Sequence, residues 1–255
     1  MKQLVQNLLG KFGYAIRRTS TLHGYNPGSA TRPIGEVNLF LEDIRARGFI
    51  PQGIIDVGAH RGEWTRLALS IFPGAPILMI EPQDEMEVFL SAITKAAPNC
   101  HFIKAGAGRK TGELVQTIWE DYAGSSFLPA TDTQLAQAGK QRKTQIVTLD
   151  SVLAQDYPKF VPDLVKLDIQ GFELEALSGA ETLFGRTEVF ILEVSLFQFM
   201  PNQPIAREVI SFMSARGYEL YDIPGRCRRP YDGALGQLDV AFVKANGSFR
   251  KVTNW

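Results

Sequence analysis

The sequence predicts a three-layer α/β fold built around a mostly parallel β-sheet. Short apolar runs alternate along the chain with stretches of helical period, which is the pattern of repeated β-α units. The run Ile77–Ile80 is apolar at every position, as is typical of a central parallel strand with both faces covered. The last two β patterns, Tyr218–Ile223 and Leu238–Lys244, have no helical stretch between them. They predict an antiparallel pair that closes the sheet.

The predicted helices end at residues that favour such a boundary. Glycine follows three of them, at Gly48, Gly185 and Gly217, because a left-handed residue commonly ends a helix. Proline follows two others, at Pro73 and Pro98, since it cannot continue a helix. The expected order is helix Glu36–Arg47, strand Gly53–Val57, helix Glu63–Phe72, strand Ile77–Ile80, helix Asp84–Ala97, strands Cys100–Lys104, Leu114–Trp119 and Thr144–Leu149, a short helix from Asp150, strand Leu164–Leu167, helix Phe172–Phe184, strand Val189–Leu192 and helix Gln203–Arg216.

The composition is that of an ordinary globular domain. Of 255 residues, 45% are hydrophobic and 21% are charged, so a full core can form. The 27 basic and 27 acidic residues balance, which argues against a dedicated nucleic-acid-binding protein. The two cysteines, Cys100 and Cys227, predict neither a disulfide framework nor a metal knuckle. No apolar run approaches the roughly 20 residues of a membrane span, and no signal peptide is recognisable, so we expect a cytoplasmic protein.

We expect two parts, an N-terminal segment (residues 1–48) and a main domain (residues 49–255). The β-α rhythm breaks near residues 112–143, which predicts an insertion over the site. The N-terminal segment comprises a basic amphipathic helix, a linker and a second helix. Residues 1–35 contain five basic side chains and no acidic one, with apolar residues at helical spacing. This helix packs on the domain, which we favour, or contacts a membrane surface or anionic glycolipid through residues 1–18.

The stretch Ile54–Thr65 predicts a strand, a glycine turn and the start of a helix. A dinucleotide fold needs Gly-x-Gly-x-x-Gly at this turn, but His60 and Glu63 occupy the second and third glycine positions. Gly58 and Gly62 form a looser turn, suited to a ligand without phosphates. Glu81 follows at about the offset where an acid accepts ribose hydroxyls. A phosphate-free ribose ligand in an acid-lined cleft fits S-adenosylmethionine.

Acidic residues occur at the ends of four predicted parallel strands. Because right-handed crossovers bring the carboxyl ends of these strands to one edge of the sheet, the acids should share a cleft there. Each of them alone is equally compatible with a helix cap or a solvated loop, but the set favours a site. The four residues are Asp56, Glu81, Asp168 and Glu193.

Three segments together resemble the FkbM family of class I S-adenosylmethionine-dependent methyltransferases. They are Asp56–Thr65 with Glu81-Pro82, Asp163–Ala180 with its Lys-x-Asp-x-x-Gly-x-Glu block, and Ile191–Val194. The similarity covers roughly residues 50–245. It implies a Rossmann-like three-layer sandwich with a mostly parallel seven-stranded sheet and a C-terminal antiparallel hairpin. It also implies O-methylation of a hydroxyl, often on a sugar or a polyketide-type natural product.

The same resemblance implies roles for individual residues on the cofactor side. Glu81 would hold the ribose, and the segment from Ala105 would lie near the adenine. Ser126, with Ser125, would belong to a serine-containing turn beside the cofactor. His60 lies in the glycine turn and is included on this side. The methionine part would be lined by Asp56, Gly58, Ala59 and Gly62.

Methyl transfer to an aliphatic hydroxyl needs a base or a metal ion to help remove the proton. Asp168 and Glu193 are the candidate catalytic residues. They would supply two oxygen ligands to a metal, but no third ligand is evident, so a divalent metal is possible and not expected. We expect Lys166 to pair with a neighbouring acid and Glu173 to meet free N–H groups at the start of its helix. Gln170 is a candidate hydrogen-bond partner of the acceptor.

Two surface segments have open interpretations. Phe197, Phe199 and Met200 form either an apolar wall for the acceptor or part of the core. Three arginines, Arg226, Arg228 and Arg229, either grip a phosphate of the acceptor or form a solvated turn.

We therefore predict an S-adenosylmethionine-dependent O-methyltransferase. Its acceptor would be a small molecule or glycan, most simply the hydroxyl of a sugar or glycosylated natural product, with a role in polysaccharide modification. Nucleic acid is not an expected partner. The alternative is a non-catalytic cofactor-binding or scaffold protein of the same fold. A nucleotide-dependent oxidoreductase is a weaker third interpretation, because the dinucleotide glycines are missing.

Overall fold

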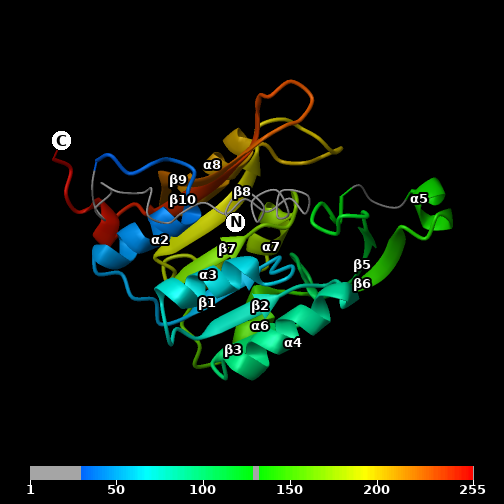
Figure 1. The fold of residues 1–255 in the computed structure, drawn as a ribbon, viewed down its shortest axis with the longest axis horizontal. Helices are drawn as coiled ribbons and strands as arrows, with labels where there is room; N and C mark the ends of the chain where they lie inside the picture. The colour runs from blue at the N-terminus through cyan, green and yellow to red at the C-terminus, as the bar shows by residue number, and fades with distance from the viewer. Residues whose placement is uncertain (1–29, 129–131, 255) are drawn as a thin grey trace, which may run out of the picture.

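The computed structural model describes residues 30–128 and 132–254. Its centre is a seven-stranded sheet in which the first five strands run parallel, the sixth runs antiparallel to both of its neighbours, and the seventh forms a hairpin with the sixth (Figure 1). This confirms the predicted mostly parallel sheet with a closing hairpin. From one edge to the other, the strands are β3 (Cys100–Ile103), β2 (Ile77–Ile80), β1 (Ile54–Val57), β7 (Leu164–Leu167), β8 (Val189–Ser195), β10 (Leu235–Lys244) and β9 (Tyr218–Arg228).

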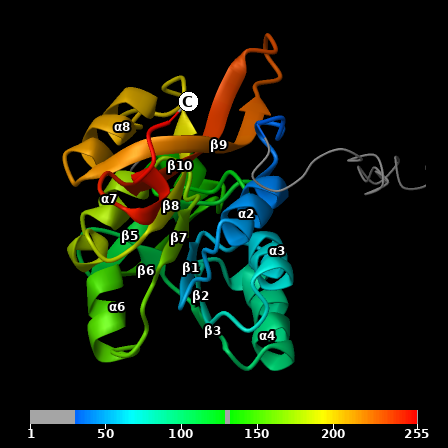
Figure 2. The same cartoon turned by 90° about the vertical axis from the view of Figure 1, so that its left-hand side faces the viewer.

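Helices cover both faces of the sheet, which gives the three layers seen in Figure 2. Alternate residues of β1 point to opposite faces of the sheet, and each face packs against its own set of helices. Ile54 lies in the hydrophobic core under one set, called the first, and Ile55 lies in the core under the second set. Both faces of the strand are therefore apolar, which explains the uninterrupted hydrophobic runs. The first set is α2 (Val37–Ala46), α3 (Glu63–Ile71) and α4 (Glu87–Ala96), and the second is α6 (Leu149–Gln155), α7 (Glu173–Leu177) and α8 (Ala206–Ser214).

Two helices are shorter than the sequence pattern predicts. α7 ends at Leu177 rather than at 184, because the chain passes close to the backbone of Gly108 at Gly179. A Cβ added to Gly179 would lie 2.2 Å from the carbonyl oxygen of Gly108. α8 begins at Ala206 rather than at Gln203, whose buried side chain instead bonds the preceding loop. Single-turn 3-10 helices occupy Asp84–Met86, Glu181–Leu183 and Ser248–Arg250.

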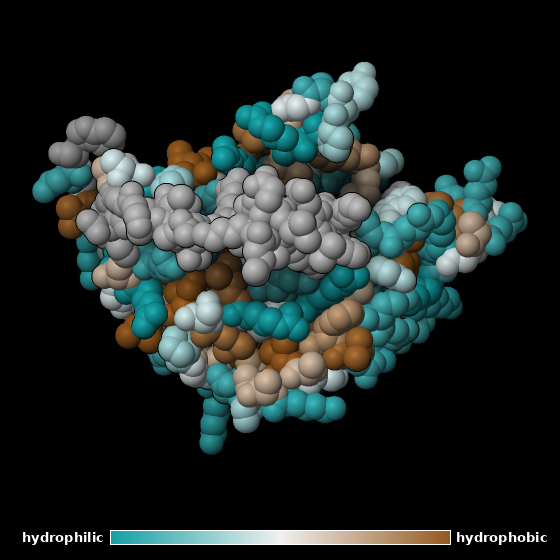
Figure 3. All heavy atoms as spheres, in the orientation of Figure 1, coloured by the Kyte–Doolittle hydropathy of each residue, from teal (hydrophilic) through white to brown (hydrophobic). Residues whose placement is uncertain are grey.

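The predicted insertion forms a second, smaller sheet. β5 (Gly112–Thr117) pairs with β6 (Gln141–Val147), and the two-residue strand β4 (Gly106–Ala107) pairs with the other edge of β6. We call residues 112–147 the arm. The arm projects from the body of the protein and has the short helix α5 (Thr133–Gln137) at its far end (Figure 1). No residue of α5 is buried. The surface of the arm is mostly hydrophilic in Figure 3.

The second predicted helix of the N-terminal segment is present as α2, with Phe40, Leu41 and Ile44 buried against the body. Arg32, which precedes it, forms ion pairs with Asp43 of α2 and with a residue of β9. The predicted basic helix at residues 1–18 lies outside the described residues. Across the two described ranges, no helix has the length and apolar character needed to span a membrane.

Candidate active site

A cavity of about 350 Å³ opens at the carboxyl edge of the parallel strands. The loops after β1, β2 and β7 form its floor, β8 forms one side, and the base of the arm forms the other. Its lining includes two groups of predicted residues. The cofactor-side residues are Gly58, Ala59, His60, Glu81 and Ala105, and the acceptor-side residues are Asp168 and Glu193.

The glycine turn exists because the backbone there needs conformations that glycine adopts freely. Gly58 has φ +75°, and a Cβ at this position would lie 2.0 Å from the carbonyl oxygen of Asp168. The turn thus brings the end of β1 against the end of β7. Gly62, with φ +77°, is absent from the cavity lining; a Cβ there would lie 2.3 Å from Cδ1 of Ile93. Its role in the fold is close packing between α3 and α4.

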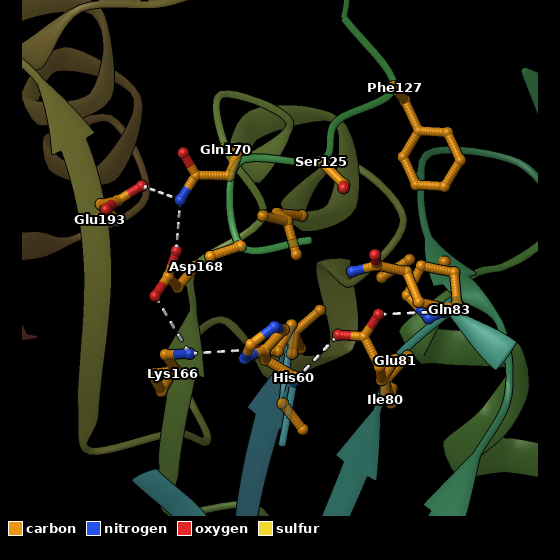
Figure 4. A pocket seen from close by; sticks show the side chains of 18 of the residues that line it. His60, Ile80, Glu81, Gln83, Ser125, Phe127, Lys166, Asp168, Gln170 and Glu193 are labelled. Atoms are coloured by element: carbon orange, nitrogen blue, oxygen red, sulfur yellow. Dashed lines mark hydrogen bonds and ion pairs between the residues drawn. The ribbon is translucent and has the colours of Figure 1, made fainter. Parts of the chain in front are cut away.

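Glu81 is the acid of the cofactor side, and the main chain holds it in place. Its Oε2 accepts a hydrogen bond from the backbone N–H of His60 (2.9 Å), and its Oε1 accepts one from the N–H of Gln83 (3.0 Å) (Figure 4). The side chain is buried on the cavity wall, and burial raises the pKa of Glu81 above its ordinary value despite these hydrogen bonds. Two fixed carboxylate oxygens beside a cavity suit hydroxyl donors.

Three polar atoms in side chains that line this end of the cavity have no hydrogen-bond partner among residues 30–128 and 132–254. They are His60 Nε2, Trp64 Nε1 and Gln83 Oε1. Leaving such buried groups unpaired costs about 1–3 kcal/mol each, which a bound polar ligand would offset. Burial also lowers the pKa of His60. Small residues form the cavity wall beside these atoms. A larger residue does not fit at Gly106, because an added Cβ would lie 2.6 Å from the ring of Phe127.

Lys166 is the positive centre of the acceptor side. Its Nζ lies 3.3 Å from Asp56 Oδ1 and 3.5 Å from Asp168 Oδ2, and it donates to the carbonyl of Gly58 at 3.2 Å. Burial lowers the pKa of Lys166, but the nearby charges of Asp56, Asp168 and Asp239 raise it further, so the pKa lies above its ordinary value. This confirms the expected pairing. Asp56 itself is fully buried beneath the cavity and also accepts from the hydroxyl of Thr65 at 2.6 Å.

Gln170 joins the two candidate catalytic carboxylates. Its Nε2 donates to Asp168 Oδ1 at 2.9 Å and to Glu193 Oε2 at 2.7 Å (Figure 4). Its backbone is left-handed, with φ +53°, and its carbonyl accepts from the hydroxyl of Ser126 at 2.8 Å. Ser126 is therefore buried behind the loop, whereas its neighbour Ser125 lines the cavity.

Glu193 lies inside β8 rather than at its end, because this strand continues to Ser195. It stands opposite Asp239 of β10 in the antiparallel register, and Gln237 Nε2 donates to its Oε2 at 2.9 Å. Burial, together with the charges of Asp168, Glu173 and Asp239, raises the pKa of Glu193. Burial and the charge of Asp168 likewise raise the pKa of Asp239 to about 6.

Sequence reasoning missed Gln237 and Asp239. They follow Glu193 by more than forty residues, and only the register of β10 against β8 brings them to the site. The available signal was polar residues at alternating positions of an otherwise apolar strand.

Glu173 meets the backbone as predicted, although in the loop before its helix. Its Oε1 accepts from the N–H groups of Ile169 (3.0 Å) and Gly171 (3.2 Å). Burial raises the pKa of Glu173 to about 7. Among the residues that the structure describes, no group of three or more His, Cys, Asp or Glu is arranged to hold a metal ion.

The two surface segments lie beside the acceptor side, not in the cavity lining. Phe197 and Phe199 are exposed, with ring centroids 6.0 Å apart. Arg229 lies over the ring of Phe197 at 3.9 Å and is paired with Asp232. The loop and the hairpin meet where Leu196 donates to the carbonyl of Gly236 at 2.8 Å.

Comparison with known proteins relates the chain to methyltransferases. The family model described as "Methyltransferase FkbM domain" matches residues 56–220. The methyltransferase sdnD of Sordaria araneosa is 26% identical over 155 residues, which cover 50% of this chain and 60% of that protein. A methyltransferase FkbM from Methylobacillus flagellatus KT is 18% identical and superposes with a TM-score of 0.48, covering 74% of this chain and 43% of that one. Magnesium protoporphyrin IX methyltransferase from Synechocystis PCC 6803, crystallised with bound SAM, is 13% identical with a TM-score of 0.47, covering 82% and 77%.

Proposed function

Because this chain belongs to the FkbM family of methyltransferases, we propose that it is an S-adenosylmethionine-dependent O-methyltransferase whose acceptor is the hydroxyl of a sugar, a glycan or a glycosylated natural product. The observation that carries this proposal is the division of one cavity. An acid fixed by main-chain N–H groups, Glu81, lies at one end, and a pair of carboxylates joined by one amide, Asp168 and Glu193, lies at the other.

The residues at the first end fit the cofactor. Glu81 has two fixed oxygens for the ribose hydroxyls, and the small residues from Ala105 to Ala107 leave room for a flat base. The unpaired atoms of His60 and Gln83 are further places where a polar ligand would be held. When bound, S-adenosylmethionine supplies an electrophilic methyl group on a positively charged sulfur.

At the second end, the protein's contribution is orientation and proton removal. Asp168 lines the cavity, and its side chain is 35% exposed, so an acceptor hydroxyl can reach it. The ammonium of Lys166 stabilises its negative charge, and Gln170 fixes the direction of its carboxyl group. We assign Asp168 as the group that takes the hydroxyl proton, with Glu193 as the second group on the acceptor.

The choice of a sugar hydroxyl as acceptor is supported by the chemistry around this end. Carboxyl and amide groups line it, and these bind hydroxyl-rich molecules by hydrogen bonds. The exposed rings of Phe197 and Phe199 stand nearby and offer flat surfaces against which a sugar ring can pack. Contact of residues 1–18 with a membrane surface or a glycolipid stays the less favoured of the two alternatives given for this segment.

The test is a screen of sugar and glycan acceptors with methyl-labelled S-adenosylmethionine. Asp168→Asn should lower methyl transfer by about 10²- to 10⁴-fold, the usual contribution of a general base. Glu193→Gln should also lower methyl transfer, because it alters the second group that contacts the acceptor. Both variants should still bind S-adenosylhomocysteine in calorimetry. Glu42→Gln, which removes an exposed acid of α2, is the matched control and should behave as wild type.

Two outcomes contradict the proposal in different ways. Correctly folded protein that binds neither S-adenosylmethionine nor S-adenosylhomocysteine would exclude the assigned cofactor. Cofactor binding with no methyl transfer to any acceptor, in wild type and variants alike, would instead favour the non-catalytic binding protein.

A further inference from the structure

The two oxygens of Glu193 have different surroundings. Oε2 accepts two hydrogen bonds, from Gln170 Nε2 at 2.7 Å and from Gln237 Nε2 at 2.9 Å. Oε1 has no hydrogen-bond donor in the described part of the chain, and Glu193 lines the cavity. The carboxyl group is thus held at one oxygen and open at the other.

The charges that face Glu193 are mostly negative. Asp168 follows β7, Glu173 lies on α7, and Asp239 stands opposite on β10. The positive group is Lys166, which Asp56 and Asp168 already share at 3.3 and 3.5 Å. Carboxylates this close in a buried site do not all ionise at neutral pH, and one of them keeps a proton.

We propose that Glu193 carries this proton on Oε1 at neutral pH. Asp239 is the positioning residue that favours the neutral form, and Gln170 and Gln237 confine the proton to Oε1 through their hydrogen bonds to Oε2. Because Oε2 already accepts two N–H bonds, it has the role of the carbonyl oxygen of a carboxylic acid, and the proton must lie on Oε1. The raised pKa of Glu193 agrees with this placement.

The consequence for the reaction rests on the proposed function. Neutral Glu193 donates a hydrogen bond from Oε1 to the acceptor oxygen and so orients it. Charged Asp168 accepts the proton that the hydroxyl loses. The new carbon–oxygen bond replaces the methyl carbon–sulfur bond of the cofactor, which would leave as S-adenosylhomocysteine. Glu193 keeps its own proton throughout, so the two carboxyl groups have distinct roles: one donor and one base.

Gln237 and Asp239 should act in opposite directions on Glu193. The negative charge of Asp239 favours the neutral form, so its removal should lower the pH at which Glu193 loses its proton. The N–H of Gln237 stabilises a negative charge on Oε2, so its removal should raise that pH. A purely structural role would not predict opposite signs.

The experiment is infrared spectroscopy of the full chain without acceptor, because only a protonated carboxyl group has the C=O stretch of a carboxylic acid. The difference spectrum between wild type and Glu193→Gln should show this band at pH 7.5. Asp239→Asn should move its midpoint down by about one pH unit and Gln237→Leu should move it up, as expected for one neighbouring charge or hydrogen bond. Glu42→Gln should leave the band unchanged.

Circular dichroism establishes that each variant is folded, and Gln237→Glu, which adds an acid beside Glu193, is a second variant expected to raise the midpoint. Absence of the band at pH 7.5 would overturn the proposal. A band that responds to neither Asp239→Asn nor the two Gln237 variants would overturn the positioning roles. Methyl transfer and cofactor binding of the wild-type protein are measured separately. If both are present and the infrared prediction fails, only the protonation proposal is contradicted, and the proposed function is not.

Discussion

The two ends of the cavity differ in whether main chain or side chains form them. The cofactor side is made by the main chain: the glycine turn sets its shape, and both oxygens of Glu81 accept backbone N–H groups. The acceptor side is made by side chains, with Lys166 among several carboxyl groups and two amides that join them. The first end therefore depends on backbone geometry, and the second depends on charge and protonation.

The largest effect should come from removing the positive centre of the acceptor side. In Lys166→Met, Asp56 loses its partner ammonium in a fully buried place. Among the residues that the structure describes, only the Thr65 hydroxyl would still donate a side-chain hydrogen bond to it. Breaking a buried ion pair in this way typically costs about 3–5 kcal/mol, so urea denaturation should show a loss of that size in the free energy of unfolding. The matched control is Lys104→Met. The side chain of Lys104 is 47% exposed, and its ammonium bridges two surface acids.

Lys104→Met should unfold close to wild type, because exposed ion pairs contribute little. If the two variants lost the same free energy of unfolding, the burial of the charges around Lys166 would not explain the effect of Lys166→Met.

A substitution in the glycine turn should have the next largest effect. Gly58→Ala places a Cβ 2.0 Å from the Asp168 carbonyl and also forces alanine into φ +75°. We expect a loss of about 3 kcal/mol, from overpacking and from the left-handed backbone together. Gly74→Ala is the control, since Gly74 has φ +86° but no atom within 4 Å of an added Cβ.

The control should lose only the backbone part, about 1 kcal/mol. Thermal and urea denaturation of both variants measure the difference. If Gly58→Ala and Gly74→Ala were equally stable, the close approach of β1 to β7 would not be the reason for glycine at position 58.

The smallest effect on folding should come from Glu81→Gln, whose main effect is on binding. The amide keeps one oxygen for a backbone N–H but turns its NH2 group toward the other N–H, which costs about 1 kcal/mol. It also removes the charge that strengthens hydrogen bonds to ribose hydroxyls. Affinity for S-adenosylhomocysteine in calorimetry should fall about 10- to 100-fold, the equivalent of a hydrogen bond to a charged group. Glu85→Gln, an acid close by in the chain that pairs with Arg142, should not change this affinity. Unchanged binding in Glu81→Gln would contradict the ribose assignment.

Much of the parallel sheet could be predicted because its signals are local. The run Ile77–Ile80 is apolar throughout since helices cover both of its faces, and its four residues are the observed strand β2. The topology then places Asp168 and Glu193 at one edge without any knowledge of their contacts. Lys166 could be assigned a carboxylate partner because a charged side chain within a buried strand needs one.

The features that could not be predicted depend on distant contacts. Gln237 and Asp239 reach Glu193 only through the pairing of β10 with β8. The early end of α7 follows from the approach of Gly179 to Gly108, about seventy residues earlier in the chain. The polar stretch at 131–143 gave no β pattern, yet β6 begins at Gln141 because it pairs with β5. Sequence periodicity reports which faces are buried, not which partner buries them.

The arm links the cavity wall to a distant part of the surface. Its strand β6 pairs with β4, which is only two residues long, and both residues of β4, Gly106 and Ala107, line the cavity. Gln116 of β5 and Phe127 also line the cavity. α5 lies at the end of the arm that is farthest from the main sheet (Figure 1). One small sheet therefore supplies residues of the cavity wall at one end and the exposed helix α5 at the other.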